Sequence, residues 1–598
     1  MSAGNLCAPT ENLRGSSERP PSPASAYAKA FVIAALFFAA IYPTLGWMGF
    51  YNGTEKISVA TALQTRRDGH WLIPLLDGRP RFVKPPLTAW ATALSIDGQT
   101  LTNLASRDPE IRHAAFRSFE IESRIWPLVS CCLLLLSVFE LGRVIGGSSF
   151  GLTCELACGS TALFLKFARL ATSDVQLALW VSVANVFLAH AILCRRRWVG
   201  CVGAGIALGL ALMSKGPVAL VESVLPALAF LPFRGKGDAK PRSWVLPILV
   251  GLGLMLLIEL PWYIYILHRL GNLWHAFRNE ITGEDSPDRA SPWYSYLGFA
   301  WLFLPWLPLL ILGAIAAVQK WLADRRQAAA GARGLLFALF LFVIPLLVLS
   351  FFKDKRDRYV LPMVGPAAIL AAAGVTHCLR EICRGNKGAL IWRTLHYWTL
   401  FVLATVLPFG GAIGAFDQVD MSQKPVFGPA LALTTIAVCW LLLGIGFLLR
   451  NTRRPALAPI TTAVMLVLQA LFFWGYSKTD DGVSPVGPLA EDLWSAYPDA
   501  CILNVNGSSA LGTTELSIYF DRPFTPIRAE YALKLIPGPQ PIIAVIKLPT
   551  GDPIAARAQV FGAFAGWRFI DRIIDDTHVW YVFLLPAKSA VAQPASGS

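Results

Sequence analysis

Long apolar stretches dominate the chain between residues 28 and 475. Each is about 20 residues long, the length of helix that crosses a hydrocarbon core of about 30 Å. The pattern predicts a polytopic α-helical membrane protein with about thirteen transmembrane helices. They are predicted at residues 28–50, 125–148, 153–170, 174–193, 199–213, 217–233, 243–266, 294–317, 333–351, 358–376, 396–415, 428–449 and 457–475. The short pairs that meet near Asp174 and near Lys215 are also compatible with one broken helix each.

The pattern changes after residue 476, where the long apolar runs end and the sequence becomes typical of a soluble domain. Short β-type runs separated by turns predict strands at residues 501–505, 516–520, 542–546 and 579–583. The predicted organisation is a flexible N-terminal segment, a transmembrane domain with a long outer loop, a small α/β domain and a tail. These parts cover residues 1–27, 28–476 with the loop at 51–124, 477–588 and 589–598.

Composition supports this assignment. Of 598 residues, 55% are hydrophobic and 15% charged, which excludes a disordered chain, a collagen and an ordinary soluble multidomain enzyme. The first apolar run is too long for a signal-peptide core, so we expect it to be retained. The 11 cysteines form no CxxC pair and the 8 histidines are scattered, so neither a disulfide framework nor a zinc site is indicated.

The net charge of +14 could indicate nucleic acid, but its distribution argues against that partner. Lys and Arg gather in alternate loops, as the positive-inside rule requires of cytoplasmic loops. We therefore expect a multi-pass protein of the cytoplasmic (inner) membrane with a cytoplasmic N-terminus. An odd number of spans then places the C-terminal domain outside the cytoplasm.

The first outer loop contains two candidate site residues. Thr54 precedes Glu55, which falls in the first turn of a predicted helix that ends near Gly69. Lys84 precedes Pro85-Pro86, which favours an extended backbone before a helix at 87–96. The alternatives are a helix-start carboxylate on a solvated surface for Glu55 and a lipid-headgroup anchor for Lys84.

Further charged residues interrupt apolar runs. Asp174 opens one predicted span and Lys215 closes another, and ionisable groups at such positions are usually functional. The segment 352–359 carries four cations and two acids on the predicted outer side. An anionic ligand such as phosphate would hold these cations there, although a different topology or anionic lipid would also explain them.

One topology places all these groups on the same side of the membrane. They are Glu55, Lys84, Arg124, Asp174, Lys215 and the 353–359 cluster. A carboxylate there can accept a proton from an attacking group, and the cations can neutralise a departing phosphate. This combination favours transfer of a group from a phosphate-linked donor.

At these residues the chain resembles the superfamily of the lipid A aminoarabinose transferases (ArnT-like) and protein O-mannosyltransferases. These are type C membrane glycosyltransferases that use a polyprenyl-phosphate-linked sugar. The resemblance covers about residues 30–375 and rests on Gly69–Pro74, Lys84–Leu87, Glu122–Pro127, Arg169–Asp174, Ser214–Pro217 and Lys355–Pro362.

The resemblance implies an undecaprenyl-phosphate-linked donor, transfer outside the cytoplasmic membrane and inversion at the anomeric carbon. It implies Glu55 and Asp174 as catalytic carboxylates, with a divalent metal at these two residues left open. It implies a donor-phosphate site at Lys84, Lys215, Lys355, Arg358 and Tyr359, with support from Thr54, Arg124, Lys353 and Arg356. The acceptor is a lipid, glycan or protein, and membrane lipids are further partners.

The chain departs from the family pattern at three positions. Thr54 stands where the family usually has an Asp, Val83 where it has an acidic residue, and Glu284 where it has an Arg, although Arg289 is close. These departures argue against a plain lipid A aminoarabinose transferase. Two other hypotheses stay open: a transporter or flippase of a lipid-linked anion, and a scaffold that has lost activity.

Overall fold

The chain is described by a computed structural model. It describes residues 23–50, 53–76, 79–82, 84–233, 242–270, 291–324, 330–353, 355–412, 428–449, 456–477, 486–505, 518, 525–527, 529–532, 534–536, 538–549, 564, 566–575 and 578–587. The chain divides into two compact units. The larger unit comprises Met1–Trp47, Val83–Thr88 and Arg124–Lys478, and the smaller comprises Met48–Phe82, Ala89–Ser123 and Thr479–Ser598.

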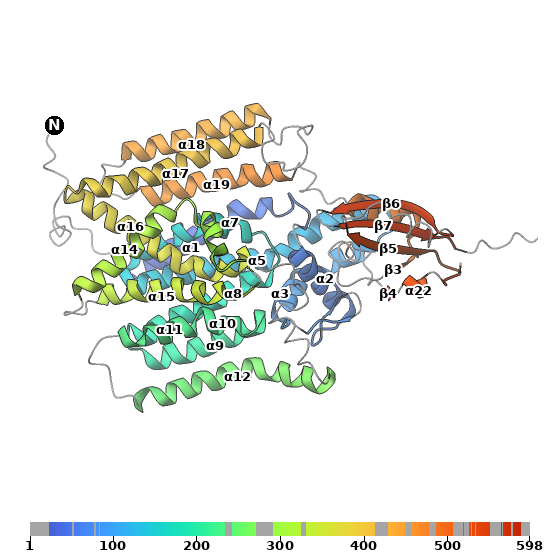
Figure 1. The fold of residues 1–598 in the computed structure, drawn as a ribbon, viewed down its shortest axis with the longest axis horizontal. Helices are drawn as coiled ribbons and strands as arrows, with labels where there is room; N and C mark the ends of the chain where they lie inside the picture. The colour runs from blue at the N-terminus through green and yellow to red at the C-terminus, as the bar shows by residue number, and fades with distance from the viewer. Residues whose placement is uncertain are drawn as a thin grey trace, which may run out of the picture. The chain divides into compact units, whose positions relative to one another are not determined.

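The larger unit is a helical bundle (Figure 1). Its elements are α1 (Pro23–Ile41), η2 (Tyr42–Thr44), most of α5 (Pro109–Gly146), α6 (Ser148–Gly159), α7 (Ala162–Phe167), α8 (Ser173–Ile192), α9 (Arg197–Lys215), α10 (Val218–Glu222), α11 (Val224–Phe230), η3 (Leu231–Phe233), α12 (Arg242–Leu270), η5 (Trp293–Phe303), α14 (Leu307–Asp324), α15 (Ala330–Ser350), η6 (Asp357–Met363), α16 (Val364–Cys383), α17 (Lys387–Ala412), α18 (Pro429–Leu449) and α19 (Leu457–Tyr476).

Ten helices within the described residues are long and apolar enough to cross a membrane, or up to eleven if a bent pair counts as one span. The bent pair is η5 and α14, which meet at 112°. The remaining predicted spans, 153–170 and 217–233, fall on the short helices α6–α7 and α10–α11. The prediction of a polytopic helical membrane protein is therefore confirmed, although its thirteen spans exceed the ten or eleven found among the described residues. In each uncertain pair one member is a whole helix, α8 or α9, and the other is divided into two short helices.

Burial within the bundle separates central helices from peripheral ones. The most apolar part of the segment Asp357–Cys383 is 89% buried inside the protein. The corresponding part of Ser243–Leu270 is only 11% buried. The exposed side chains of α12 are large and apolar, among them Leu246, Leu249 and Leu257. Since lipid tails are as apolar as these side chains, such a face is suited to the bilayer. The protein is a multi-pass membrane protein.

The smaller unit joins parts of the first loop to the C-terminal region. Its elements are α2 (Gly53–Asp68), β1 (Leu75–Leu76), β2 (Arg79–Pro80), most of α3 (Leu87–Ser95), α4 (Gly98–Leu104), the start of α5, α20 (Val486–Ala496), β3 (Cys501–Val505), β4 (Thr525–Ile527), α22 (Ala529–Ala532), β5 (Ile542–Pro549), β6 (Arg568–Asp575) and β7 (His578–Leu585).

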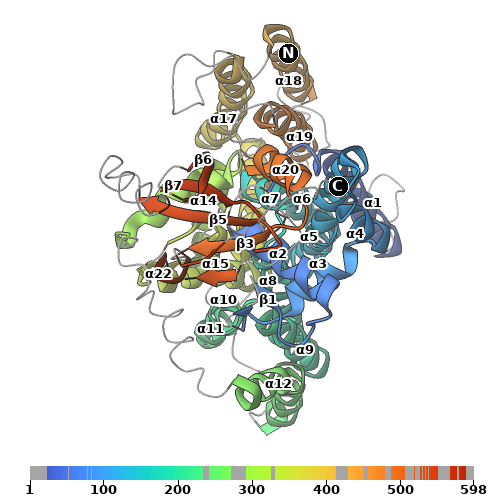
Figure 2. The ribbon, with the colours of Figure 1, turned by 90° about the vertical axis from the view of Figure 1, so that its right-hand side faces the viewer.

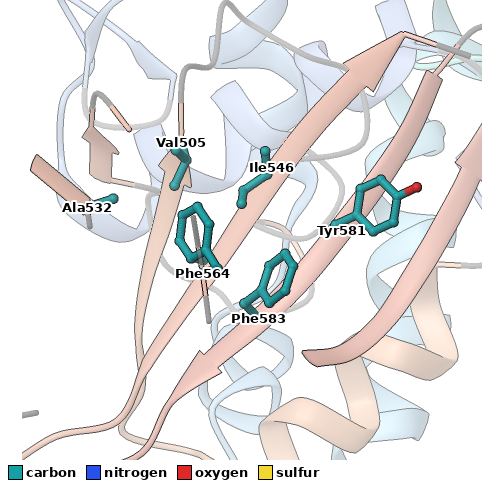
Figure 3. Packing of buried hydrophobic residues seen from close by; sticks show 7 residues of the cluster. Val505, Ala532, Ile546, Phe564, Tyr581 and Phe583 are labelled. Atoms are coloured by element: carbon teal, nitrogen blue, oxygen red, sulfur yellow. The ribbon is translucent and has the colours of Figure 1, made fainter. Parts of the chain in front are cut away.

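The five strands β3–β7 form one mixed sheet in the order β4-β3-β5-β7-β6 (Figure 2). Strand β3 is parallel to β4 and β5, and β7 is antiparallel to β5 and β6. Side chains of Val505, Ala532, Ala544, Ile546, Phe564, Tyr581 and Phe583 pack into a core on this sheet (Figure 3). The Phe564 and Phe583 rings stack with centroids 5.1 Å apart. The strands predicted at 501–505, 542–546 and 579–583 are confirmed, and 516–520 lies outside the described residues except for Ile518.

Helix α20, which precedes the sheet along the chain, packs against the start of α5. The guanidinium of Arg112 lies 4.3 Å from the Trp494 ring centroid and donates to Leu104 O at 3.1 Å. His113 Nδ1 lies 3.4 Å from Glu491 Oε1. Helix α5 has 38 residues and is therefore about 57 Å long, well beyond the thickness of a hydrocarbon core. The predicted loop 51–124 thus ends in a helix that begins at Pro109, not at residue 125.

Candidate active site at the ends of two helices

The first turn of α8 positions Asp174. The helix begins at Ser173 after Thr172, whose backbone is extended, although its side chain makes no capping hydrogen bond. Asp174 is 1% exposed. The partial positive charge at a helix N-terminus stabilises a carboxylate there, which offsets part of its loss of water. A carboxylate opening this helix was predicted, and the structure confirms it.

The last residue of α9 positions Lys215. Gly216 follows with φ +83°, a backbone conformation that suits glycine and ends the helix. The Lys215 ammonium donates a hydrogen bond to Asp174 Oδ1, so the two groups form an ion pair. The C-terminal end of a helix favours a cation, just as the N-terminal end favours an anion.

Two residues of η6 complete the cluster around Asp174. Arg358 Nε lies 3.9 Å from Asp174 Oδ2. The Tyr359 ring is close to both cations, with Lys215 Nζ 4.5 Å and Arg358 Cζ 5.3 Å from its centroid. Asp174 Oδ2 is buried and accepts no hydrogen bond from any described residue. The structure thus brings together Asp174, Lys215, Arg358 and Tyr359, four of the residues proposed from the sequence.

The residues before η6 form a compact loop against the start of η5. Lys355 is 7% exposed and donates to Ser291 O at 2.9 Å and to Phe352 O at 2.7 Å. An ammonium has three donors, and these two carbonyls engage two of them. Lys353 is exposed and its carbonyl accepts from Ser291 N, while Arg356 is half-buried and precedes η6. Asp354 lies outside the described residues.

Lys84 belongs to the larger unit, with the segment Val83–Thr88. Thr88 Oγ1 donates to Gln176 Oε1 at 2.8 Å, so this segment contacts the first turns of α8. Arg124 has a different environment. It is buried on α5, donates to Leu45 O at 2.6 Å and is close enough to Arg169 for the two cations to repel.

Thr54 and Glu55 belong to the smaller unit, near the start of α2. Glu55 is buried in the first turn, and the helix ends at Asp68 before Gly69, as predicted. Residues 59–65 are all buried, so burial extends around the whole of that part of the helix. Asn52, Val83, Glu284 and Arg289 lie outside the described residues.

The sequence interpretation missed two charged residues near this site, Lys166 and Glu222, and counted Asp357 only as one acid of the 353–359 cluster. Lys166 of α7 and Asp357 of η6 form an ion pair, with Nζ 2.6 Å from Oδ2. Glu222 of α10 is 2% exposed and its Oε2 accepts no hydrogen bond from the described residues. Each of Lys166 and Glu222 is a lone charge in an apolar run, the same signal that identified Asp174 and Lys215.

The cluster around Asp174 combines one carboxylate with several cations. Its free carboxylate oxygen can take a proton, and the cations of Lys215 and Arg358 can stabilise negative charge on a bound group. No group of three or more His, Cys, Asp or Glu side chains in the described ranges is arranged to hold a metal ion.

Comparison with known proteins gives the following relationships. Residues 113–265 match the family described as dolichyl-phosphate-mannose-protein mannosyltransferase. An undecaprenyl phosphate-alpha-4-amino-4-deoxy-L-arabinose arabinosyl transferase of Sodalis glossinidius (strain morsitans) is 31% identical over 324 residues, 52% of this chain and 53% of the relative. A transferase with the same description from Proteus mirabilis (strain HI4320) is 27% identical over 324 residues, with the same coverage. The chain thus spans about half the length of these curated relatives.

Solved structures cover more of the chain. The crystal structure of ArnT from Cupriavidus metallidurans in the apo state matches with a TM-score of 0.69 and 18% identity, over 94% of this chain and 98% of that one. The same protein bound to undecaprenyl phosphate matches with a TM-score of 0.69 and 16% identity, over 93% and 98%. The chain therefore shares the fold of the ArnT structures over nearly its whole length, and about half of it is similar in sequence to the arabinosyl transferases.

Proposed function

We propose that the protein is a glycosyltransferase that moves a sugar from a polyprenyl (undecaprenyl) phosphate to a lipid, glycan or protein acceptor. The observation that carries this proposal is the environment of the Asp174 carboxylate. Its Oδ2 is buried, accepts no hydrogen bond within the described residues, and lies 3.9 Å from Arg358 Nε. A carboxylate with one oxygen engaged by Lys215 and the other available is arranged to take a proton from a nucleophile.

At the anomeric carbon of the sugar, the reaction forms one bond and breaks one. An acceptor oxygen attacks the anomeric carbon, the bond from that carbon to the phosphate oxygen breaks, and undecaprenyl phosphate leaves with the electron pair. Attack from the face opposite the phosphate inverts the anomeric carbon. The acceptor proton passes to a carboxylate, Asp174 or Glu55, and the leaving phosphate needs cations more than it needs an acid.

The cations of η6 and α9 are suited to the leaving phosphate. Arg358 offers a planar fork of donors and Lys215 a compact charge. Lys84 and Lys355 would add further donors, with Lys353 and Arg356 close to the latter in sequence. The hydroxyl of Tyr359 can donate to a phosphate oxygen.

A membrane location follows from the same proposal. The donor carries a lipid chain, so its phosphate lies at headgroup level, where helix ends and not helix centres are found. Asp174 and Lys215 are at helix ends. Transporters usually hold such groups near the bilayer midplane, so the positions favour transfer over transport. The basic loops support a cytoplasmic N-terminus and an outer-face site in the cytoplasmic membrane.

The names of the relatives suggest the substrate class. They describe transfer of 4-amino-4-deoxy-L-arabinose from undecaprenyl phosphate, and ArnT has been crystallised with undecaprenyl phosphate. We extend the lipid carrier to this chain and leave the sugar open, because Thr54 and Val83 depart from the family pattern.

The test is a membrane assay. Membranes containing the protein are incubated with undecaprenyl phosphate carrying different labelled sugars, and the label is followed into lipid, glycan and protein fractions. Transfer above that of membranes lacking the protein supports the proposal. Movement of the intact labelled donor across the bilayer without transfer would replace it with a flippase.

A further inference from the structure

The ion pair of Lys166 and Asp357 connects the candidate site to a fixed part of the bundle. Lys166 lies in the last turn of α7, and its ammonium is 2.6 Å from Asp357 Oδ2. Helix α7 is anchored at its start, where Thr161 Oγ1 accepts from Phe164 N at 3.2 Å. Just after α7, the buried Arg169 donates to Thr44 Oγ1 and Leu165 O, both at 2.8 Å. Lys166 therefore stands on a well-anchored segment.

The second oxygen of Asp357 contacts the residue that reaches Asp174. Asp357 Oδ1 accepts a hydrogen bond from Arg358 N at 2.7 Å. One carboxylate thus joins the Lys166 ammonium to the backbone of Arg358, whose Nε lies 3.9 Å from Asp174 Oδ2. Tyr359 N in turn donates to Arg356 O, so the start of η6 is held from two sides.

Charge gives this pair a role beyond anchoring. Asp357 is adjacent to Arg358, and a carboxylate without its own cation would compete with Asp174 and with a bound phosphate for that guanidinium. Lys166 neutralises Asp357 and so leaves the Arg358 guanidinium directed at Asp174. The side chains of Lys166 and Asp357 are 26% and 28% exposed, so the pair contributes little to the free energy of unfolding.

We propose that Lys166 and Asp357 are positioning residues that hold Arg358 and Tyr359 against Asp174 and thereby set the affinity for the donor phosphate. This inference rests on the proposed function, since it assigns the pair to the phosphate site of the same reaction. The two residues act through Arg358 and touch no reacting atom.

The experiment compares Lys166→Met, Asp357→Asn and the double variant in full-length protein. Lys166→Met removes the cation that pairs with Asp357. We expect it to raise the KM for the donor about tenfold with kcat little changed, since losing a hydrogen bond from Arg358 to a charged phosphate costs about one decade of affinity. In the double variant the competing carboxylate is gone, so most of the lost affinity returns. A merely structural pair would instead give additive losses in both parameters.

The matched control is Arg384→Met, which removes an exposed ion pair with Glu381 at the end of α16 and leaves the donor KM unchanged. Binding of undecaprenyl phosphate alone, measured by native mass spectrometry, separates this inference from the proposed function. Wild-type turnover with an unchanged donor KM in Lys166→Met overturns the inference alone. Binding that weakens in Lys166→Met and returns in the double variant supports it even without turnover. Absence of both binding and turnover in the wild type overturns both proposals.

Discussion

Asp174 and Lys215 form an ion pair between the start of one helix and the end of another. Asp174 is in the first turn of α8 and Lys215 is the last residue of α9. Each helix end stabilises the charge placed on it, and the side chains are 1% and 9% exposed. The Lys215 cation offsets part of the cost of burying the Asp174 carboxylate, which would be high for a lone charge in an apolar environment.

This pair predicts opposite effects of double substitution on stability and on activity. Lys215→Met or Asp174→Asn alone should lower the free energy of unfolding by about 3 kcal/mol, since each leaves a buried group without its partner. The double variant should recover most of that loss, because neither charge remains. Transfer should stay absent in all three. Thermal unfolding in detergent and the transfer assay measure the two quantities, and additive destabilisation in the double variant would argue against a coupled pair.

The close packing of helices α14 and α16 predicts that adding a methyl group between them lowers stability. A Cβ added at Gly374 of α16 would lie 1.9 Å from Leu309 O of α14, and one added at Gly313 would lie 1.8 Å from Leu370 O. Small residues let membrane helices approach to this distance. Gly374→Ala should therefore destabilise the protein by at least about 2 kcal/mol through overpacking. Gly444→Ala in α18, where a Cβ meets open space, is the control. Equal melting temperatures for the two variants would show that α14 and α16 do not approach so closely.

The proposed topology predicts the labelling of native cysteines. Cys194, Cys383 and Cys501 are the exposed cysteines among the described residues. In single-cysteine variants, a membrane-impermeant maleimide applied to intact spheroplasts should label Cys501 and spare the other two, and inverted vesicles should give the reverse. Labelling of Cys501 from the cytoplasmic side would contradict an outer C-terminal domain.

The labelling rate should also depend on pH. Partial loss of hydration beside neighbouring parts of the chain raises the pKa of the Cys194 thiol, although the residue is exposed to solvent. Less of it is therefore thiolate at neutral pH, and its reaction should be slow there. The rate should rise as the pH increases toward that pKa. This dependence, followed in inverted vesicles between pH 7 and about 9, distinguishes slow chemistry from inaccessibility. A rate that stays near zero throughout would place Cys194 away from the cytoplasmic side.

Much of the fold could be predicted because apolar length and charge are local properties of the sequence. The long helices and three of the strands follow from them, and lone charges in apolar runs identified Asp174 and Lys215. The start of α5 was missed because its first residues are polar, which indicates a loop when no neighbouring element is known. The broken spans at α6–α7 and α10–α11 are too short for a length criterion to separate from whole ones.

The candidate site was predicted only in part, because several of its contacts join residues that are far apart in the sequence or involve backbone atoms. Lys166 and Asp357 are 191 positions apart, so nothing in their local sequence indicates that they pair. The two carbonyls that bind Lys355 come from backbone conformation, which a residue pattern does not specify. Arg124 has the burial expected of a site residue, yet it donates a hydrogen bond to Leu45 O, just after η2.

The central claim, sugar transfer from undecaprenyl phosphate with a carboxylate as proton acceptor, is tested most directly by one measurement. Wild-type protein, Asp174→Asn and Glu55→Gln are compared for transfer of label from undecaprenyl-phosphate sugars, with Glu110→Gln, an exposed carboxylate of α5, as control. We predict transfer by the wild type and the control, and at least about a hundredfold loss in the other two at equal expression. Wild-type rates in both Asp174→Asn and Glu55→Gln would contradict the account.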